Sequence, residues 1–392
     1  MNEWIYKISL WLLVSTAACT LSPPTDKHRR DKAKVESKKG PVDQNVFDRG
    51  LVVQEPKPID ILRESGLYCK DTKLRQFNGE VLGYITPWNA EGSELSKTFH
   101  GKLTSVSPVW LSLPRGNVKK FQVATHDVQK KWLKEMRAFN DGNHTVRILP
   151  RVLFEEWTPE EISALTNDNQ RKTQLVSVLS ETAKTFQFQG YVLEIWNQFV
   201  FTGVKTKVVV NLIKSLGKRL QSKNLEVILA IPPARGPEGQ IFSQAYFEEV
   251  APHVDYFSLM TYDFSNVQRP GPNAPLEWVR ECVEKLVPDD DDPRRSQILM
   301  GLNFYGNNYT PEGGGPILGS QYLKILESYK GKIQWDDRSK EHFFEAKSPG
   351  SGFIFFPTLY SLQQRIDLAR ELGTGLSIWE LGQGLNYFYD LL

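Results

Sequence analysis

Residues 172–231 read KTQLVSVLSETAKTFQFQGYVLEIWNQFVFTGVKTKVVVNLIKSLGKRLQSKNLEVILAI and alternate between two patterns. Residues 172–185 and 205–223 space their apolar side chains three and four positions apart, which is typical of helices that pack by one face. Residues 190–196 and 225–231 are short apolar runs, as in strands buried on both faces. The segment therefore predicts a helix–strand–helix–strand unit of a parallel sheet.

The same alternation extends over residues 76–392. The other candidate strands are 79–85, 103–110, 144–150, 254–262, 297–305 and 375–379, and the other candidate helices are 128–139, 275–287 and 362–372. Eight buried strands joined by helices predict an α/β fold, the (β/α)8 TIM barrel. An open doubly wound sheet is the alternative. No glycine-rich turn follows the first strand, which disfavours a dinucleotide-binding form of that sheet.

Residues 307–350 form a segment longer than a usual strand-to-helix loop. The segment contains three consecutive glycines, 313–315, and the aromatic pair Phe343 and Phe344. It predicts a small insertion between strands 7 and 8, such as a hairpin over the cleft.

The first 75 residues have a different composition. Lys7 ends a short polar start, residues 8–14 are apolar, and small residues continue to Cys19. This order predicts a secretory signal peptide over residues 1–19, with a buried strand or helix as the alternative. The apolar run is shorter than the roughly 20 residues of a membrane span. Residues 20–75 predict a basic solvated linker and an N-terminal extension, with a polyanion-binding arm as the alternative to the linker.

Two features agree with secretion. Asn143 and Asn308 each begin an acceptor sequence for N-glycans. Removal of residues 1–19 would leave Cys69 and Cys282, and an even number permits one disulfide. Free thiols in apolar surroundings are the alternative. We therefore expect a secreted glycoprotein.

The overall composition excludes several classes of protein. Lys and Arg total 48 against 46 Asp and Glu, so the net charge of +2 argues against a nucleic-acid partner. Aromatic residues make up 11% of the chain, too many for a disordered protein. The histidines lack the spacing to cysteines or carboxylates that a zinc site needs. We expect neither a metal nor another cofactor.

Aromatic and polar residues gather where the predicted strands end. In a (β/α)8 barrel the functional residues lie at these carboxyl ends and in the loops after them. Aromatic rings stack on the C–H faces of sugars, and polar side chains bind the hydroxyls, so the pattern predicts a saccharide-binding cleft. Core packing is the alternative for each residue alone. The candidates are Tyr84, Trp88, Trp110, Glu194, Trp196, Asn197, Met260, Tyr262, Asp263, Asn303, Tyr305 and Trp379.

Three of these strand ends resemble glycoside hydrolase family 18, the chitinase family. Residues 258–264, SLMTYDF, are similar to its sixth-strand motif M-T-Y-D, and residues 301–306, GLNFYG, to its seventh-strand motif G-x-x-F-Y-G. Residues 375–379, GLSIW, are similar to the eighth strand, which ends in the tryptophan that floors the sugar site. The resemblance extends over about residues 77–392 and implies binding of N-acetylglucosamine-containing glycans.

Further stretches resemble a chitinase-like branch of the family. They are VLGYITPWN, SPVWL, PRVLFEEW, EIWNQ, PGPNAPLEWVR, EHFFEAK and SIWELGQGL. Members of this branch are secreted or lysosomal and bind saccharides rather than being established chitinases. The resemblance also implies an endocytic or sorting receptor as partner, and a role in innate immunity.

The fourth-strand motif of the family, D-x-x-D-x-D-x-E, is not conserved in this chain. With the register set by Phe188 and Gly190, its positions are occupied by Gln189, Val192, Glu194 and Trp196. The family's glutamate protonates the leaving oxygen, in a scheme in which the substrate's own acetamido group attacks. Trp196 stands at that position, and an indole cannot supply a titrating proton. The third-strand pattern S-x-G-G is also replaced, by Leu149-Pro150-Arg151-Val152.

These departures predict a non-catalytic, lectin-like barrel without a catalytic residue. Strand alternation would place Glu194 and Trp196 on one face about 6.6 Å apart, so that Glu194 lies too deep to replace the acid and Trp196 adds a stacking face. Two alternatives remain. One is a residual or altered glycoside hydrolase that uses Glu194 or Asp263 as its acid. The other is a protein-interaction scaffold with a vestigial cleft.

Overall fold

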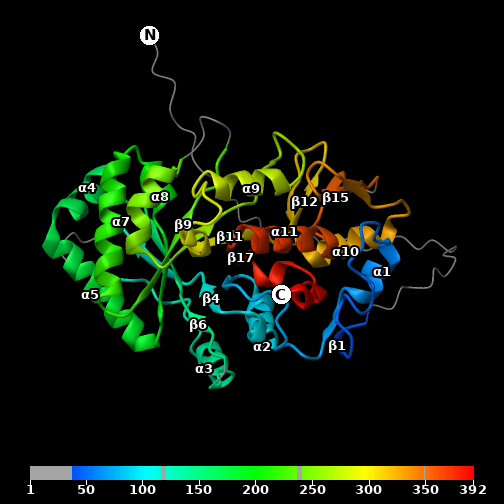
Figure 1. The fold of residues 1–392 in the computed structure, drawn as a ribbon, viewed down its shortest axis with the longest axis horizontal. Helices are drawn as coiled ribbons and strands as arrows, with labels where there is room; N and C mark the ends of the chain where they lie inside the picture. Colours follow the sequence, from blue (N-terminus) through cyan, green and yellow to red (C-terminus); the bar gives the residue numbers. More distant parts are fainter. Residues whose placement is uncertain (1–37, 116–120, 143, 236–240, 348) are drawn as a thin grey trace, which may run out of the picture. The chain divides into compact units, whose positions relative to one another are not determined.

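The computed structural model describes residues 38–115, 121–142, 144–235, 241–347 and 349–392, and its central feature is a parallel sheet (Figure 1). The strand order is β5-β7-β8-β9-β10-β11-β17-β3-β4-β6. In chain order the bounds are β3 Val81–Ile85, β4 Ser105–Pro108, β5 Leu111–Pro114, β6 Arg147–Ile148, β7 Arg151–Glu155, β8 Gly190–Glu194, β9 Glu226–Ile231, β10 Tyr256–Leu259, β11 Ile298–Asn303 and β17 Gly375–Trp379. The predicted signal peptide lies outside the described residues.

These ten strands occupy eight positions of a closed barrel. Only two residues separate β4 from β5, and two separate β6 from β7, so each pair is one interrupted strand. The first halves pair with each other, Val106 opposite Ile148, and so do the second halves, Leu111 opposite Val152. Both ends of the strand order therefore belong to the same two strands, and the sheet closes on itself. This confirms the (β/α)8 barrel over the open sheet.

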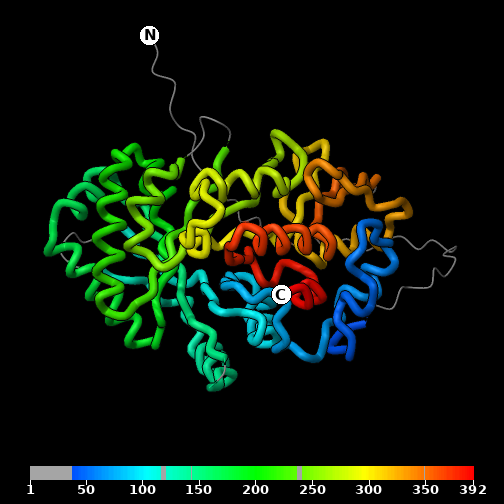
Figure 2. Tube along the Cα trace, viewed as in Figure 1, coloured from blue at the N-terminus to red at the C-terminus, as the bar shows by residue number. Residues whose placement is uncertain are grey.

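Helices lie along the outside of the barrel (Figures 1 and 2). They are α2 Ala90–Thr98, α3 Lys130–Ala138, α4 Pro159–Asn167, α5 Asn169–Phe186, α6 Trp196–Val200, α7 Thr206–Gln221, α8 Gln244–Val250, α9 Leu276–Glu284 and α11 Leu359–Leu372. In α7, Leu212, Leu216 and Leu220 are buried on one face, as their spacing predicts. The inner face of the sheet supplies the core, where Leu82, Leu149, Val192, Ile228 and Leu299 meet.

The predicted insertion between strands 7 and 8 is present and larger than a hairpin. It is an antiparallel sheet of order β13-β12-β16-β15-β14 with one helix, α10 Gly319–Ser328. Its strands are β12 Gly306–Tyr309, β13 Gly315–Ile317, β14 Gln334–Asp336, β15 Glu341–Glu345 and β16 Phe353–Phe355. Tyr322 of α10 stacks on Phe356 at 4.2 Å between ring centroids, which fixes the helix against the chain that follows β16.

The N-terminal extension packs beside the C-terminal segment. Strands β1 Gly40–Val42 and β2 Leu67–Cys69 pair in parallel and flank α1 Pro58–Glu64 (Figure 1). The buried carboxylate of Asp390 accepts a hydrogen bond from the Cys69 amide at 2.9 Å and pairs with Arg49 at 3.5 Å. Residues 38–75 therefore include a folded extension as well as linker.

The structure bears on two possible modifications. Cys69 and Cys282 are both free thiols, the first on β2 and the second buried in α9, which agrees with the free-thiol alternative and not with a disulfide. Asn308 lies buried in β12, where its side-chain amide donates to Gly350 O at 2.9 Å and accepts from the Gly352 amide at 3.0 Å. A glycan on this nitrogen would break the first bond. Asn143 lies outside the described residues.

Candidate functional site

A chain of hydroxyl groups crosses the barrel interior below the carboxyl ends of its strands. The Tyr84 hydroxyl, from β3, donates to Ser258 Oγ of β10 at 2.9 Å, and Ser258 Oγ lies 2.8 Å from Ser377 Oγ of β17. Burial raises the pKa of Tyr84 to about 12, so its hydroxyl stays protonated. The three residues join strands 1, 6 and 8 and form a polar floor.

Trp379 lies above this floor at the end of β17. Its ring centroid is 5.2 Å from that of Tyr84, with the planes tilted by 54°. The residue is only partly buried, unlike Tyr84. Trp379 can therefore offer ring surface to a ligand while Tyr84 supports it from below.

An ion pair that the sequence analysis missed lies at the same end of the barrel. Arg151 begins β7, Glu194 ends the adjacent β8, and Arg151 Nη1 lies 2.7 Å from Glu194 Oε2. The Arg151 guanidinium carbon is also 5.9 Å from the centroid of Trp379. Side-chain exposures of 15% and 24% leave both groups within reach of a ligand. The sequence feature that could have indicated this ion pair is Arg151 itself, a charged residue in the altered third-strand motif.

Tyr262, Asp263 and Tyr305 form a second cluster. The two tyrosine rings meet edge to face at 6.4 Å between centroids, and the Tyr305 hydroxyl donates to Asp263 Oδ1. Although Asp263 as a whole residue is exposed, the protein packed around its carboxyl group raises that group's pKa, and the Tyr305 hydrogen bond opposes the rise. Tyr262 and Tyr305 are themselves largely buried, so Asp263 is the ligand-accessible member.

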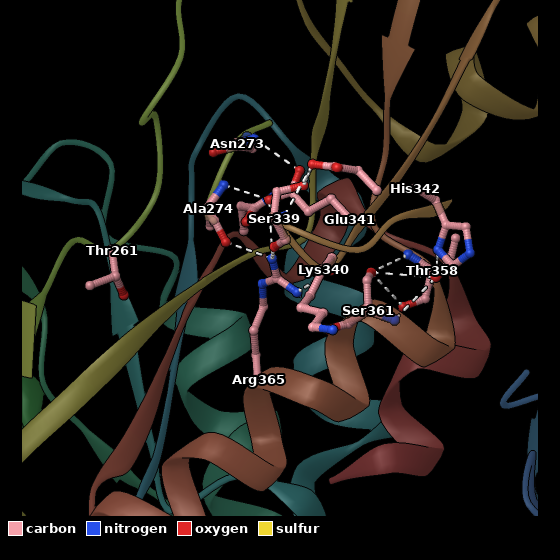
Figure 3. A network of polar contacts seen from close by, with 12 residues as sticks. Thr261, Asn273, Ala274, Ser339, Lys340, Glu341, His342, Thr358, Ser361 and Arg365 are labelled. Carbon is pink, nitrogen blue, oxygen red and sulfur yellow. Dashed lines mark hydrogen bonds and ion pairs between the residues drawn. The ribbon is translucent and has the colours of Figure 1, made fainter. Parts of the chain in front are cut away.

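The chain after Asp263 is anchored by a buried network shown in Figure 3. The Asp263 amide donates to Asn273 Oδ1 at 2.7 Å. The amides of Asn273 and Ala274 donate to the two carboxylate oxygens of Glu341 at 2.9 and 2.6 Å, and Glu341 in turn pairs with Arg365 of α11 at 3.1 Å. The insertion and α11 thus hold the backbone that presents Asp263.

Trp196 does not lie where strand alternation predicts, and this expectation is wrong. Strand β8 ends at Glu194, and the helical backbone of Ile195 starts α6 at Trp196. The indole is 0% exposed and packs edge to face on Phe242 at 4.6 Å and against Tyr246 at 5.4 Å. It has no free face for a sugar.

The other candidates divide by exposure. Trp110 is buried against Trp132 at 5.3 Å, and Asn303 is buried with its amide donating to Tyr305 O at 2.8 Å, so both support the core. Asn197 and Met260 are partly buried. Trp88 is 69% exposed in the loop after β3. The residues that reach a ligand are thus fewer than the sequence predicts.

Glu380 is a buried carboxyl group that the sequence analysis left unused. Asn89 donates to it at 2.7 Å and the Thr86 amide at 3.4 Å, which ties the loop after β3 to the end of β17. A Cβ atom at Gly92 would overlap Glu380 Oε1, so only glycine allows α2 to pack this closely. Burial raises the pKa of Glu380 to about 7.

The family assignment follows from the sequence match. Residues 80–384 match the model of glycosyl hydrolases family 18, and this span includes every barrel strand. The chain belongs to family 18. The candidate site described above lies where (β/α)8 enzymes carry their functional residues, at the carboxyl ends of the strands.

Solved structures agree with the family 18 fold. A class V chitininase from Pseudomonas fluorescens Pf-5 is similar with a TM-score of 0.65 and 21% identity, covering 80% of this chain and 98% of that one. The spore cortex-lytic enzyme SleL of Bacillus megaterium QM B1551 has a TM-score of 0.64 and 18% identity, covering 90% and 85%. A group IV chitinase of Ostrinia furnacalis has a TM-score of 0.64 and 16% identity, covering 80% and 98%.

Among the described residues there is no group of three or more His, Cys, Asp or Glu side chains that could hold a metal ion. In the same part of the chain no helix is both long and apolar enough to cross a membrane.

Proposed function

We propose that this family 18 protein binds an oligosaccharide at the Trp379 end of its barrel and does not cleave it. The observation that carries the proposal is the position of Trp196, which is buried in α6 directly beyond the fourth strand. By the register of the motif, this is the position of the family's proton donor. Indole offers only a weak N–H donor, and loss of a general acid typically lowers the rate about 10²–10⁴-fold.

The remaining carboxylate on this strand is poorly suited to replace the acid. Glu194 already accepts a charge-assisted hydrogen bond from Arg151 at 2.7 Å. This carboxylate oxygen is held by Arg151, whereas a general acid must be free to reach the leaving oxygen. We therefore assign Glu194 a binding role.

The accessible groups suit a saccharide. Trp379 supplies a ring for stacking on a pyranose, and Glu194 and Asp263 supply acceptors for hydroxyl or amide groups. One or two stacking rings contribute roughly 0.5–1.5 kcal/mol each beyond area burial. We expect dissociation constants between micromolar and millimolar, and the similarity to the family's motifs favours N-acetylglucosamine-containing glycans.

A second candidate function is residual or altered hydrolysis through Asp263. It is favoured by one observation, the raised pKa of this carboxyl group caused by the protein packed around it. A protonated carboxyl group could donate to a leaving oxygen. Against this role, the Asp263 carboxylate accepts a hydrogen bond from Tyr305, which stabilises its ionised form.

Within the family we assign the chain to the chitinase-like branch that comprises the chitinase domain-containing, or stabilin-interacting chitinase-like, proteins. The assignment rests on the sequence stretches quoted above. It carries the further proposals of a secreted or lysosomal location, an endocytic or sorting receptor as partner, and a role in innate immunity. Recovery of the expressed chain from culture medium, with residues 1–19 removed, would test the first of these.

The deciding experiment is isothermal titration of the whole chain with chitotetraose, followed by chromatography of the recovered sugar. We expect saturable heat and intact tetrasaccharide. Trp379→Ala should abolish the heat, and the matched control Phe139→Ala, which removes an exposed ring at the end of α3, should leave it unchanged. Shorter sugars would contradict the non-catalytic proposal. No heat at millimolar sugar would contradict chitin-type recognition and leave the scaffold alternative.

A further inference from the structure

Arg151 occupies a central position in the candidate site. It reaches from β7 to Glu194 on the neighbouring strand and to within 5.9 Å of the Trp379 ring centroid on strand 8. Its positive charge also acts on the hydroxyl groups of Tyr84 and Tyr262. Arg151 therefore interacts with four of the candidate residues, the other two being Glu194 and Trp379. Any sugar that stacks on Trp379 must therefore accommodate a guanidinium group.

Arg147, four residues earlier on β6, shows a guanidinium with two carboxylate partners. Its Nη1 lies 2.7 Å from Glu226 Oε2, and its Nη2 pairs with Glu80. Arg151 has a comparable arrangement on one side only, since Nη1 pairs with Glu194. Among the described residues, Nη2 of Arg151 has no hydrogen-bond acceptor and its Nε is buried without one. A guanidinium group offers five donors, and because Nε is buried, Nη2 is the nitrogen with capacity for a second anion.

We infer that Arg151 makes the site select an acidic saccharide, one whose carboxylate or sulfate group takes the second position on the guanidinium while a neighbouring ring stacks on Trp379. The inference rests on the proposed saccharide-binding function and specifies its ligand class. Arginine binds planar carboxylates with paired hydrogen bonds, which suits a uronic acid in particular.

A neutral sugar gains less binding free energy at Arg151. It offers no charge to Arg151, and it can use Glu194 fully only by displacing Arg151 from it, which would leave a partly buried cation unpaired. The other accessible carboxylate is also near a cation, because Arg235 donates to the Asp263 carbonyl at 3.0 Å. Each accessible carboxylate of the site thus has a cation beside it, which offsets the repulsion that the carboxylates would exert on an acidic ligand.

The test compares two tetrasaccharides by isothermal titration of the whole chain at low salt. One is chitotetraose, and the other alternates N-acetylglucosamine with glucuronate. We expect the acidic sugar to bind about tenfold more tightly, the effect of one charge-assisted hydrogen bond. Arg151→Gln keeps a donor for Glu194 but removes the charge, and it should bring the two affinities to within about twofold of each other. Arg151→Lys should retain part of the preference.

The matched control is Arg294→Gln, which removes another arginine that lies over an aromatic ring, Phe247, before β11. It should leave the preference unchanged. Thermal unfolding identifies any variant that fails to fold, and Arg151→Lys then supplies the comparison. Equal affinity of the wild-type chain for both sugars, or a preference that survives Arg151→Gln, would overturn the inference while saccharide binding stands. If neither sugar binds, the proposed function fails together with the inference.

Discussion

The guanidinium of Arg365 lies 3.1 Å from Glu341 Oε1 where the insertion, α11 and the chain leading to α9 meet, and both side chains are almost fully buried. Glu341 also accepts from two consecutive backbone amides, Asn273 and Ala274 (Figure 3). The pair therefore connects the inserted sheet to the backbone that carries Asp263. Removing either partner would leave the other buried charge without its counter-ion.

We predict that Arg365→Met lowers the free energy of unfolding by about 3–5 kcal/mol, the usual cost of breaking a buried ion pair on one side. Urea unfolding followed by tryptophan fluorescence measures this change. The matched control is Arg280→Met, because Arg280 pairs on the surface with Glu371, whose side chain is 60% exposed. A surface pair contributes about 0–1 kcal/mol, so similar losses in both variants would contradict the role assigned to Arg365.

Glu380 predicts an unusual pH dependence of stability. Its pKa is about 7 in the folded chain against an ordinary value of 4.5, because burial disfavours the charged form. The folded state therefore holds the proton more tightly than the unfolded state. The resulting stabilisation is complete below pH 4.5 and is lost as pH rises to 7, by on the order of 3 kcal/mol.

The measurement is chemical denaturation between pH 4 and 8 for the wild type and Glu380→Gln. Glutamine keeps an acceptor for Asn89 but cannot ionise. The wild type should therefore lose stability relative to this variant as pH rises from 4.5 to 7. Parallel curves would show that Glu380 has an ordinary pKa.

For His342 we predict that folding stability changes with pH in the opposite direction. Its Nε2 lies 2.8 Å from Gln54 O and its Nδ1 2.8 Å from Thr358 Oγ1, and burial lowers its pKa from 6.5 to about 4. The unfolded state therefore takes up the proton first as pH falls. The stability contributed by neutral His342 is present above pH 6.5 and is lost progressively down to pH 4, by roughly 3 kcal/mol.

His342→Gln should therefore be destabilising at pH 7.5 and lose less additional stability than the wild type on acidification to pH 4.5. NMR titration of the imidazole provides an independent measurement. A folded-state pKa near 6.5 would contradict the prediction. Because Glu380 and His342 act in opposite directions, only the single variants separate their contributions.

The burial of Trp196 leads us to predict that replacing it with glutamate will not restore hydrolysis. Trp196→Glu restores the residue type of the family's motif, but in this fold it places a carboxyl group against Phe242 and Tyr246. We expect a loss of about 3–5 kcal/mol in unfolding free energy, typical of replacing a buried tryptophan, and no release of shorter sugars from chitotetraose. Appearance of hydrolysis would show that residue 196 can reach the site.

The barrel could be predicted from the sequence because buried strands and amphipathic helices have distinct periods, as residues 172–231 illustrate. The strand ends were harder to predict. Periodicity carried β8 on to Trp196, whereas the backbone turns into a helix after Glu194, and that turn reverses which way the tryptophan points. Trp110 and Asn303 also stand at strand ends in the sequence, but tertiary contacts bury them.

The Arg151–Glu194 pair could not be predicted from either strand alone. It depends on the register that sets Leu153 beside Glu194 in neighbouring strands. Likewise, the buried group Glu341, Arg365 and Ala274 combines residues up to 91 positions apart. Such long-range contacts do not appear as a periodic pattern in the sequence. Arg151 is an exception in part, because a charged residue there replaces a motif of small residues.

The bond between the Cys69 amide and Asp390 has a consequence for the timing of folding during synthesis. The two residues are 321 positions apart. At about 5–20 residues per second, roughly 16–64 seconds pass on the ribosome between them. During that interval the extension around β2 lacks its permanent partner, and the barrel strands emerge one after another beside it. The extension can therefore complete its docking only after Asp390 has been synthesised.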